Sequence, residues 1–124
     1  MNGADPLLVD TNIFIFLLEG NKQVAEFLSG KTLYFSVITE IELLGVPGIS
    51  RKQQALVVEM LNSCQRIGLT ESIVQSAISI RQKRKIKVPD AIIAATAKEN
   101  GLAVATADKD FSLVTEVNSI LFDI

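Results

Sequence analysis

Short apolar stretches with strand character alternate with longer stretches of helical periodicity along this chain. The expected strands are residues 7–9, 33–36, 64–67, 102–105 and 119–122, the last of them at a sheet edge. The expected helices are residues 13–18, 22–28, 38–44, a helix from the Ser50 cap to about Asn62, a helix from the Thr70 cap through Arg81, and residues 90–97, which are apolar nearly all round. Strands separated by helices imply a parallel sheet with helices on both faces. At 124 residues the chain is expected to be one domain, residues 1–124.

Composition removes several classes of function. No apolar run reaches the roughly 18 residues that a membrane span needs, so no membrane association is expected. Cys64 is the single cysteine and cannot form an internal disulfide, which fits a reducing, cytoplasmic location. The chain has no histidine, which argues against zinc binding and excludes histidine acid–base chemistry.

Four acidic residues are the candidate site. Asp10, Asp90 and Asp108 stand where an apolar run meets polar residues, and Glu42 lies inside an apolar segment. In a parallel α/β sheet such junctions fall at the carboxyl ends of the strands, where ligands bind. Two carboxylates about 5 Å apart repel by roughly 3 kcal/mol at an effective dielectric near 20, so a divalent cation would stabilise the cluster. Oxygen-only ligands suit Mg²⁺ or Mn²⁺.

Each aspartate also has a simpler explanation, because aspartate is a preferred helix N-cap. Glu42 does not fit that explanation. It borders an apolar helical stripe between Ile38 and Val46, so we expect it to be half-buried and to need a cation or donors. In a purely structural interpretation Arg66 or Lys83 would be its partner, and helical phase prefers Glu42 over Glu40 only weakly.

Positive charge is concentrated in one segment although the net charge is −2. Residues 81–87 contain five of the twelve basic residues: Arg81, Lys83, Arg84, Lys85 and Lys87. From the run alone, a solvated last turn of a helix is the better explanation, since cations favour a helix C-terminus. Beside an acidic cluster, the same strip would instead contact a phosphate backbone while metals contact the reacting phosphate.

Four segments in series resemble a PIN domain, and are most similar to the VapC-type toxins of bacterial toxin–antitoxin pairs. They are residues 8–13 (Leu-Val-Asp-Thr-Asn-Ile), 36–45 (Ser-Val-Ile-Thr-Glu-Ile-Glu-Leu-Leu-Gly), 89–97 (Pro-Asp-Ala-Ile-Ile-Ala-Ala-Thr-Ala) and 105–111 (Ala-Thr-Ala-Asp-Lys-Asp-Phe). Each motif alone is weak, but the order and spacing match over essentially the whole chain. The resemblance implies a three-layer α/β/α sandwich with a central parallel sheet.

The resemblance also implies the roles of the site residues. Asp10, Glu42, Asp90 and Asp108 match the family's acidic quartet and would be the catalytic and metal-binding residues, holding one or two Mg²⁺ or Mn²⁺ ions. Asn12 and Thr106 would orient these carboxylates, and Asp110 would be a cap or an outer ligand. Hydrolysis of a backbone phosphodiester by activated water would leave 5′-phosphate and 3′-hydroxyl ends.

As a VapC-type protein the chain would be a toxin endoribonuclease acting on RNA, a homodimer, and held by a small antitoxin that inserts a segment at the acidic site. A housekeeping RNA-processing nuclease would have the same site, and a non-catalytic PIN fold that binds RNA or protein usually loses acids of the quartet. A receiver domain needs adjacent acids after its first strand, where this chain has Asp10-Thr11-Asn12. A haloacid-dehalogenase-type phosphatase needs an aspartate where Asn12 stands, and is usually longer.

Overall fold

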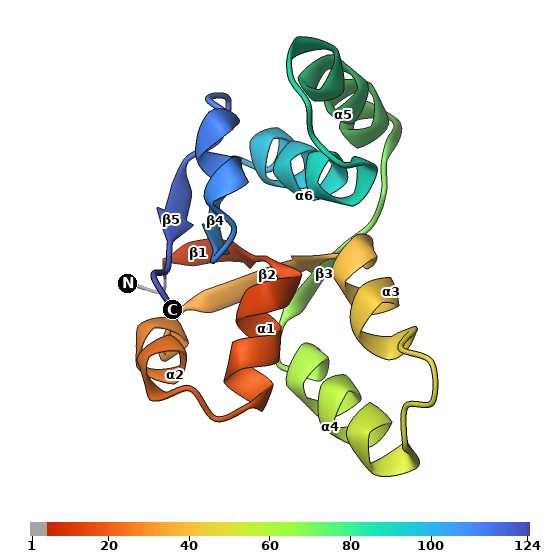
Figure 1. Cartoon of the computed structure of the whole chain (residues 1–124), viewed down its shortest axis with the longest axis vertical. Helices are drawn as coiled ribbons and strands as arrows, with labels where there is room; N and C mark the ends of the chain where they lie inside the picture. The colour runs from red at the N-terminus through yellow and green to blue at the C-terminus, as the bar shows by residue number, and fades with distance from the viewer. Residues whose placement is uncertain (1–4) are drawn as a thin grey trace.

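Five parallel strands form the centre of the fold, in the order β3-β2-β1-β4-β5 (Figure 1). The computed structural model describes residues 5–124, so the first four residues of the predicted domain lie outside the described part. The strands are β1 (Pro6–Val9), β2 (Thr32–Ser36), β3 (Gln65–Ile67), β4 (Ala103–Thr106) and β5 (Ser119–Leu121). Each lies within one residue of its predicted bounds, and β5 lies at an edge as expected. The predicted parallel sheet is therefore confirmed.

Helices cover both faces of this sheet, as Figure 1 shows. One layer holds α1 (Thr11–Leu18), α2 (Lys22–Leu28), α3 (Val37–Leu44) and α4 (Arg51–Asn62). The other holds α5 (Glu71–Lys83), α6 (Val88–Glu99) and the 3₁₀ helix η1 (Lys109–Leu113). The predicted three-layer α/β/α sandwich is confirmed. No helix within residues 5–124 is long and apolar enough to cross a bilayer.

Alternating residues of the central strands build the two halves of the core. Leu7 and Val9 of β1 pack in the cluster that includes α1, α2 and α4, whereas Leu8 between them packs in the cluster of α5 and α6. In β4, Val104 joins Leu8, and Ala105 joins the other side. This is the period of two expected when a strand is buried on both faces. The nearly all-apolar α6 is buried as predicted, with α5 packed across it.

Local signals in the sequence explain where most helices begin. Ser50 caps α4 in a reciprocal capping box with Gln53, and Thr70 caps α5 by accepting a hydrogen bond from the Ile73 N–H, both as predicted. The predicted start of α6 was wrong. The helix begins at Val88, ahead of the proline, because the fixed φ of a proline suits the first turn of a helix. Asp90 consequently lies inside the first turn of α6 and does not cap it.

Candidate active site

The four candidate acids stand at or near the carboxyl-terminal edge of the sheet. Asp10 directly follows β1, and its backbone N–H donates to Ala105 O of the neighbouring β4 at 2.9 Å. Asp108 comes two residues after the end of β4. Glu42 lies on α3, which follows β2 directly, and Asp90 lies in the first turn of α6. Four separate segments of the chain thus contribute one carboxylate each.

Asp10 is the buried member of the group, with 4% of its surface exposed. As the N-cap of α1 it accepts a hydrogen bond from the Thr11 N–H on Oδ1 at 2.8 Å. Its Oδ2 accepts from the Thr106 hydroxyl at 2.8 Å and from the Asn12 side-chain amide at 3.2 Å. Burial raises the pKa of Asp10 to about 6, and the nearby Asp90 and Glu42 add to that rise against the lowering effect of the hydrogen bonds.

Asn12 and Thr106 connect Asp10 to the loop that carries Asp108. The Asn12 Oδ1 accepts from the Ala107 N–H at 3.1 Å, while its amide donates to Asp10. The Thr106 hydroxyl donates to Asp10 and accepts from the Asp108 N–H at 3.0 Å. Each side chain therefore spans the gap between the end of β1 and the end of β4. Both side chains contact Asp10, and their role in orienting a metal-binding carboxylate stays a prediction.

Glu42 differs from what the helical pattern predicts. It is exposed rather than half-buried, because α3 ends at Leu44 and the apolar stripe does not continue to Val46. Its proposed cationic partners are engaged elsewhere: Arg66 pairs with Glu40 at 2.7 Å, and Lys83 lies 3.7 Å from Glu116. Glu42 instead accepts a hydrogen bond from the Thr11 hydroxyl at 2.6 Å. The carboxylate thus faces α1 and the side of the site where Asp10 lies.

Asp90 and Asp108 form the other side of the site. Desolvation raises the pKa of the half-buried Asp90, and the charges of Asp108 and Glu42 raise it further. Asp108 caps η1 by accepting from the Asp110 N–H at 2.9 Å, so the cap explanation and a place in the site hold together. Asp110 is exposed in the first turn of η1 and also raises the pKa of Asp90. The carboxylates influence one another across the whole edge.

The donor set suits a hard divalent cation. It consists of carboxylate oxygens. Desolvation, followed by the charge of neighbouring acids, raises the pKa of Asp10 and Asp90, and a bound cation would stabilise their ionised forms. Within residues 5–124 no three acidic side chains are close enough to ligate one ion together. Mg²⁺ commonly keeps several waters and takes one or two protein carboxylates, so this spacing is compatible with it. Three of the roughly four lone-pair sites of Asp10 are taken by donors, which leaves one on Oδ1 for an ion.

A cleft of about 530 Å³ joins the acidic side chains to the basic segment. Its lining residues are Arg81, Arg84, Lys85, Ile86, Lys87, Asp90, Asp108 and Asp110. Arg84 in this cleft is already bound, since its guanidinium donates to Glu116 at 2.7 Å. Arg81 donates to the backbone oxygen of Ile86 at 3.1 Å. The basic segment therefore does face the candidate site, and Lys85 and Lys87 are the exposed lysines that line the cleft.

A family model for the PIN domain matches residues 7–117. The chain belongs to the PIN domain family. The predicted family is therefore confirmed over nearly the whole chain. A toxin–antitoxin complex from Klebsiella pneumoniae is similar to this PIN domain with 29% identity and a TM-score of 0.82, over 95% of this chain and 99% of that one. FitAcB from Neisseria gonorrhoeae is similar with 28% identity and a TM-score of 0.78, over 92% and 96%.

The structure of VapBC2 from Rickettsia felis bound to a promoter DNA fragment has 18% identity to this PIN domain and a TM-score of 0.85, over 95% of this chain and 99% of that one, which shows the shared fold. The predicted resemblance to VapC-type proteins agrees with these neighbours. A search of curated proteins gave no match.

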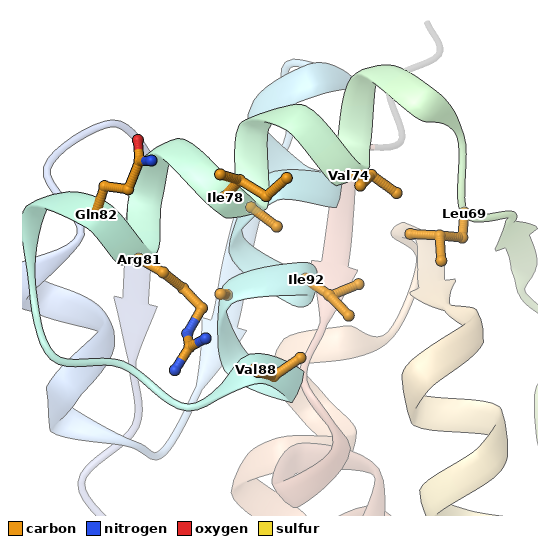
Figure 2. Close-up of a pocket in the computed structure, with 9 residues that line it drawn as sticks. Leu69, Val74, Ile78, Arg81, Gln82, Val88 and Ile92 are labelled. Atoms are coloured by element: carbon orange, nitrogen blue, oxygen red, sulfur yellow. The ribbon is translucent and has the colours of Figure 1, made fainter.

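This PIN domain also carries two apolar grooves in addition to the basic cleft. One, of about 490 Å³, lies between α5 and α6, and Figure 2 shows the labelled side chains that line it, with Ile78 and Val88 about half exposed. The other, of about 470 Å³, lies between α1, α3 and α4, and contains Ile15, Leu18 and Glu42. The second groove therefore borders the acidic site directly, whereas the first meets the basic cleft only at Arg81.

Sequence analysis missed three residues that contact the quartet, its supporting side chains or the basic segment, and one of them is Thr39, whose hydroxyl lies 2.9 Å from that of Thr11. Thr11 contacts both Asp10 and Glu42, and Glu116 binds Arg84 from 32 positions away. Thr11 had a usable signal, because it lies inside the first acidic motif next to Asp10. Nothing in the residues around Glu116 indicates that it would meet the basic segment.

Proposed function

We propose that this PIN domain is a divalent-metal-dependent endoribonuclease and the toxin of a toxin–antitoxin pair. The observation that carries the proposal is the gathering of Asp10, Glu42, Asp90 and Asp108 from four segments at one sheet edge, beside a cleft lined with lysine and arginine. The family assignment supports nuclease chemistry, and the similarity to a toxin–antitoxin complex favours a toxin over a housekeeping nuclease. The four retained acids argue against a binding-only module.

The acids would hold one or two Mg²⁺ or Mn²⁺ ions. A bound divalent ion would supply the Lewis acid that activates water and stabilises charge on the phosphate. Asp10 is the central ligand in this proposal, because Thr11, Thr106 and Asn12 fix its carboxylate in one orientation. A pKa of about 6 leaves Asp10 mostly ionised at neutral pH, ready to bind a cation. Glu42 approaches from α3, and Asp90 and Asp108 approach from the α6 side.

RNA would enter through the basic cleft. Lys85 and Lys87 would contact backbone phosphates, because their ammonium groups are exposed in the cleft that contains Asp90 and Asp108. Arg81 would add a third positive charge. Arg84 and Lys83, also predicted to bind RNA, would act mainly by pairing with Glu116 and holding the basic segment against the loop after η1.

The antitoxin would occupy the groove between α1, α3 and α4. Exposed apolar side chains there, including Ile15, Leu18 and Leu56, suit an apolar segment of a partner protein. Glu42 in the same groove suits a cationic side chain on that segment, which would neutralise the acidic site. A small basic and apolar antitoxin segment therefore fits both features of this surface.

A homodimer would use the groove between α5 and α6 (Figure 2). Leu69, Ile78 and Val88 are each about half exposed there, and the groove does not contain the four acids. A second copy docked on this face would leave the antitoxin groove free. The variant Ile78→Asp should then convert dimers to monomers by light scattering, and an unchanged mass would contradict this face. A cytoplasmic location stays a prediction.

Cleavage of RNA by the purified chain tests the nuclease proposal. We expect cleavage with Mg²⁺ or Mn²⁺, none with EDTA, and products with 5′-phosphate and 3′-hydroxyl ends. Asp10→Asn should be inactive, and Lys52→Gln, at an exposed position on α4, should be active. Cleavage that persists in EDTA or in Asp10→Asn would refute the proposal. Growth arrest on expression, relieved by a neighbouring small gene product, would identify a toxin rather than a housekeeping enzyme.

A further inference from the structure

Two threonine hydroxyls lead from the protein interior to Glu42. Thr39 lies on α3, three residues before Glu42 and on the same side of the helix, and its side chain is fully buried at 0% exposure. Thr11 is the first residue of α1. The Thr11 Oγ1 lies 2.9 Å from the Thr39 Oγ1 and 2.6 Å from the Glu42 Oε1. These three side chains form one continuous line of hydrogen bonds.

The direction of that line follows from the number of protons. An ionised glutamate can only accept, so the single hydroxyl proton of Thr11 goes to Glu42. The Thr11 oxygen must then accept the hydroxyl proton of Thr39. Hydrogen bonds in series polarise one another, so the buried Thr39 strengthens the bond that Thr11 makes to the carboxylate.

Thr11 holds two acids of the site at once. Its backbone N–H donates to Asp10 Oδ1 at 2.8 Å while its hydroxyl donates to Glu42. Asp10 is held by the end of β1, whereas Glu42 is an exposed side chain on α3 with several rotamers open to it. The predicted cationic partners of Glu42, Arg66 and Lys83, pair with other glutamates. The orientation of Glu42 thus depends on Thr11.

We infer that Thr11 is a positioning residue that fixes Glu42 relative to Asp10, and that Thr39 fixes the hydroxyl of Thr11. The inference rests on the proposed metal site, because its consequence is a pre-ordered Glu42 ligand. Side chains that orient a metal ligand typically change metal affinity by about 10–100-fold when they are removed. Loss of the Thr11 hydroxyl should weaken metal binding even though all four carboxylates are retained.

Calorimetric titration of Mn²⁺ into the full chain without RNA tests this role. We expect Thr11→Val to weaken Mn²⁺ binding by about 10-fold or more, and Thr11→Ser to restore it, because serine keeps the hydroxyl. Thr39→Val should weaken binding by about threefold or more, with Thr39→Ser restoring it. The matched control is Thr115→Val, since Thr115 is an exposed threonine in the loop after η1 that takes no part in the hydrogen bonds to Asp10 and Glu42.

Thermal unfolding in EDTA separates positioning from folding, because valine has nearly the volume of threonine. If the valine variants unfold at the wild-type temperature but bind Mn²⁺ less tightly, the positioning role of Thr11 and Thr39 is supported. If Thr11→Val failed to fold, Thr39→Val would carry the same comparison. If both valine variants bind Mn²⁺ with wild-type affinity while Glu42→Gln binds it weakly, the positioning role of the two threonines is refuted and the proposed metal site is supported. If the wild-type chain binds no Mn²⁺, both the proposed metal site and the positioning role of the two threonines are refuted.

Discussion

Replacing Asp10 by asparagine should stabilise the metal-free protein while it abolishes activity. Burial raises the pKa of Asp10 from 3.8 to about 6, so the folded protein resists ionisation of this side chain. At neutral pH that resistance costs about 3 kcal/mol of folding stability, since each pKa unit corresponds to 1.36 kcal/mol. Asparagine has nearly the same shape and no charge to desolvate.

The expected gain is smaller than the whole cost. The asparagine oxygen can keep the hydrogen bond from the Thr11 N–H, but its amide would face the hydroxyl of Thr106 and the amide of Asn12, both donors to Asp10. Reversing the Thr106 hydroxyl and losing one such bond costs about 1 kcal/mol. Asp10→Asn should therefore be more stable by about 2 kcal/mol at neutral pH, equivalent to roughly 6–10 °C in Tm for a chain of this size.

The pH dependence makes this prediction specific. Below pH 3.8 Asp10 is protonated in both the folded and unfolded states and gives no penalty, whereas between pH 3.8 and about 6 the unfolded state loses its proton first. The wild-type chain should lose stability relative to Asp10→Asn across that window. Urea unfolding of both proteins in EDTA from pH 4 to pH 7.5 measures the difference. A gap that stays constant with pH, or a variant less stable than wild type at pH 7.5, would refute the desolvation argument.

Three other predictions concern the basic segment and the scaffold. Lys87→Glu should raise the KM for RNA by about 10-fold and reduce the salt dependence of RNA binding. The same effect from Lys52→Glu on α4 would contradict a specific contact between Lys87 and RNA. Arg84→Ala and Glu116→Ala should each lower the free energy of unfolding by about 2 kcal/mol, measured by urea unfolding. The double variant should be little less stable than either single variant, whereas additive losses of stability would show that the pair is not coupled. Ser50→Ala should cost about 1 kcal/mol through the capping box, and an unchanged urea midpoint would count against it.

The strands were predictable because their signals are local. Residues 7–9 and 102–105 are short apolar runs that end at polar junctions, and a strand buried on both faces needs nothing else. The caps at Ser50 and Thr70 were equally local. The start of α6 was wrongly placed because a proline in the first turn of a helix and a proline before a helix look alike in sequence.

Features that depend on how helices pack against one another were predicted wrongly or missed. The exposure of Glu42 depends on where α3 stops and how it lies against α1, which no single segment determines. The contact between Thr11 and Thr39 joins residues 28 positions apart through that same packing. The spacing of Thr39 and Glu42 on one helix did contain part of the signal, since residues three apart share a face. The sequence does not show that α1 places the Thr11 hydroxyl next to Thr39 and Glu42 of α3.

The candidate site draws on both helical layers, and this division has a functional consequence. Asp10 and Glu42 belong to the side of α1 and α3, where an apolar groove reaches Glu42. Asp90 and Asp108 belong to the side of α6 and η1, where the basic cleft begins. A polyanion attracted by lysines and an apolar segment of a partner protein would thus approach from different sides and compete only at the carboxylates. Substitutions in one approach should leave the other ligand's affinity unchanged, which allows catalysis and inhibition to be separated by mutation.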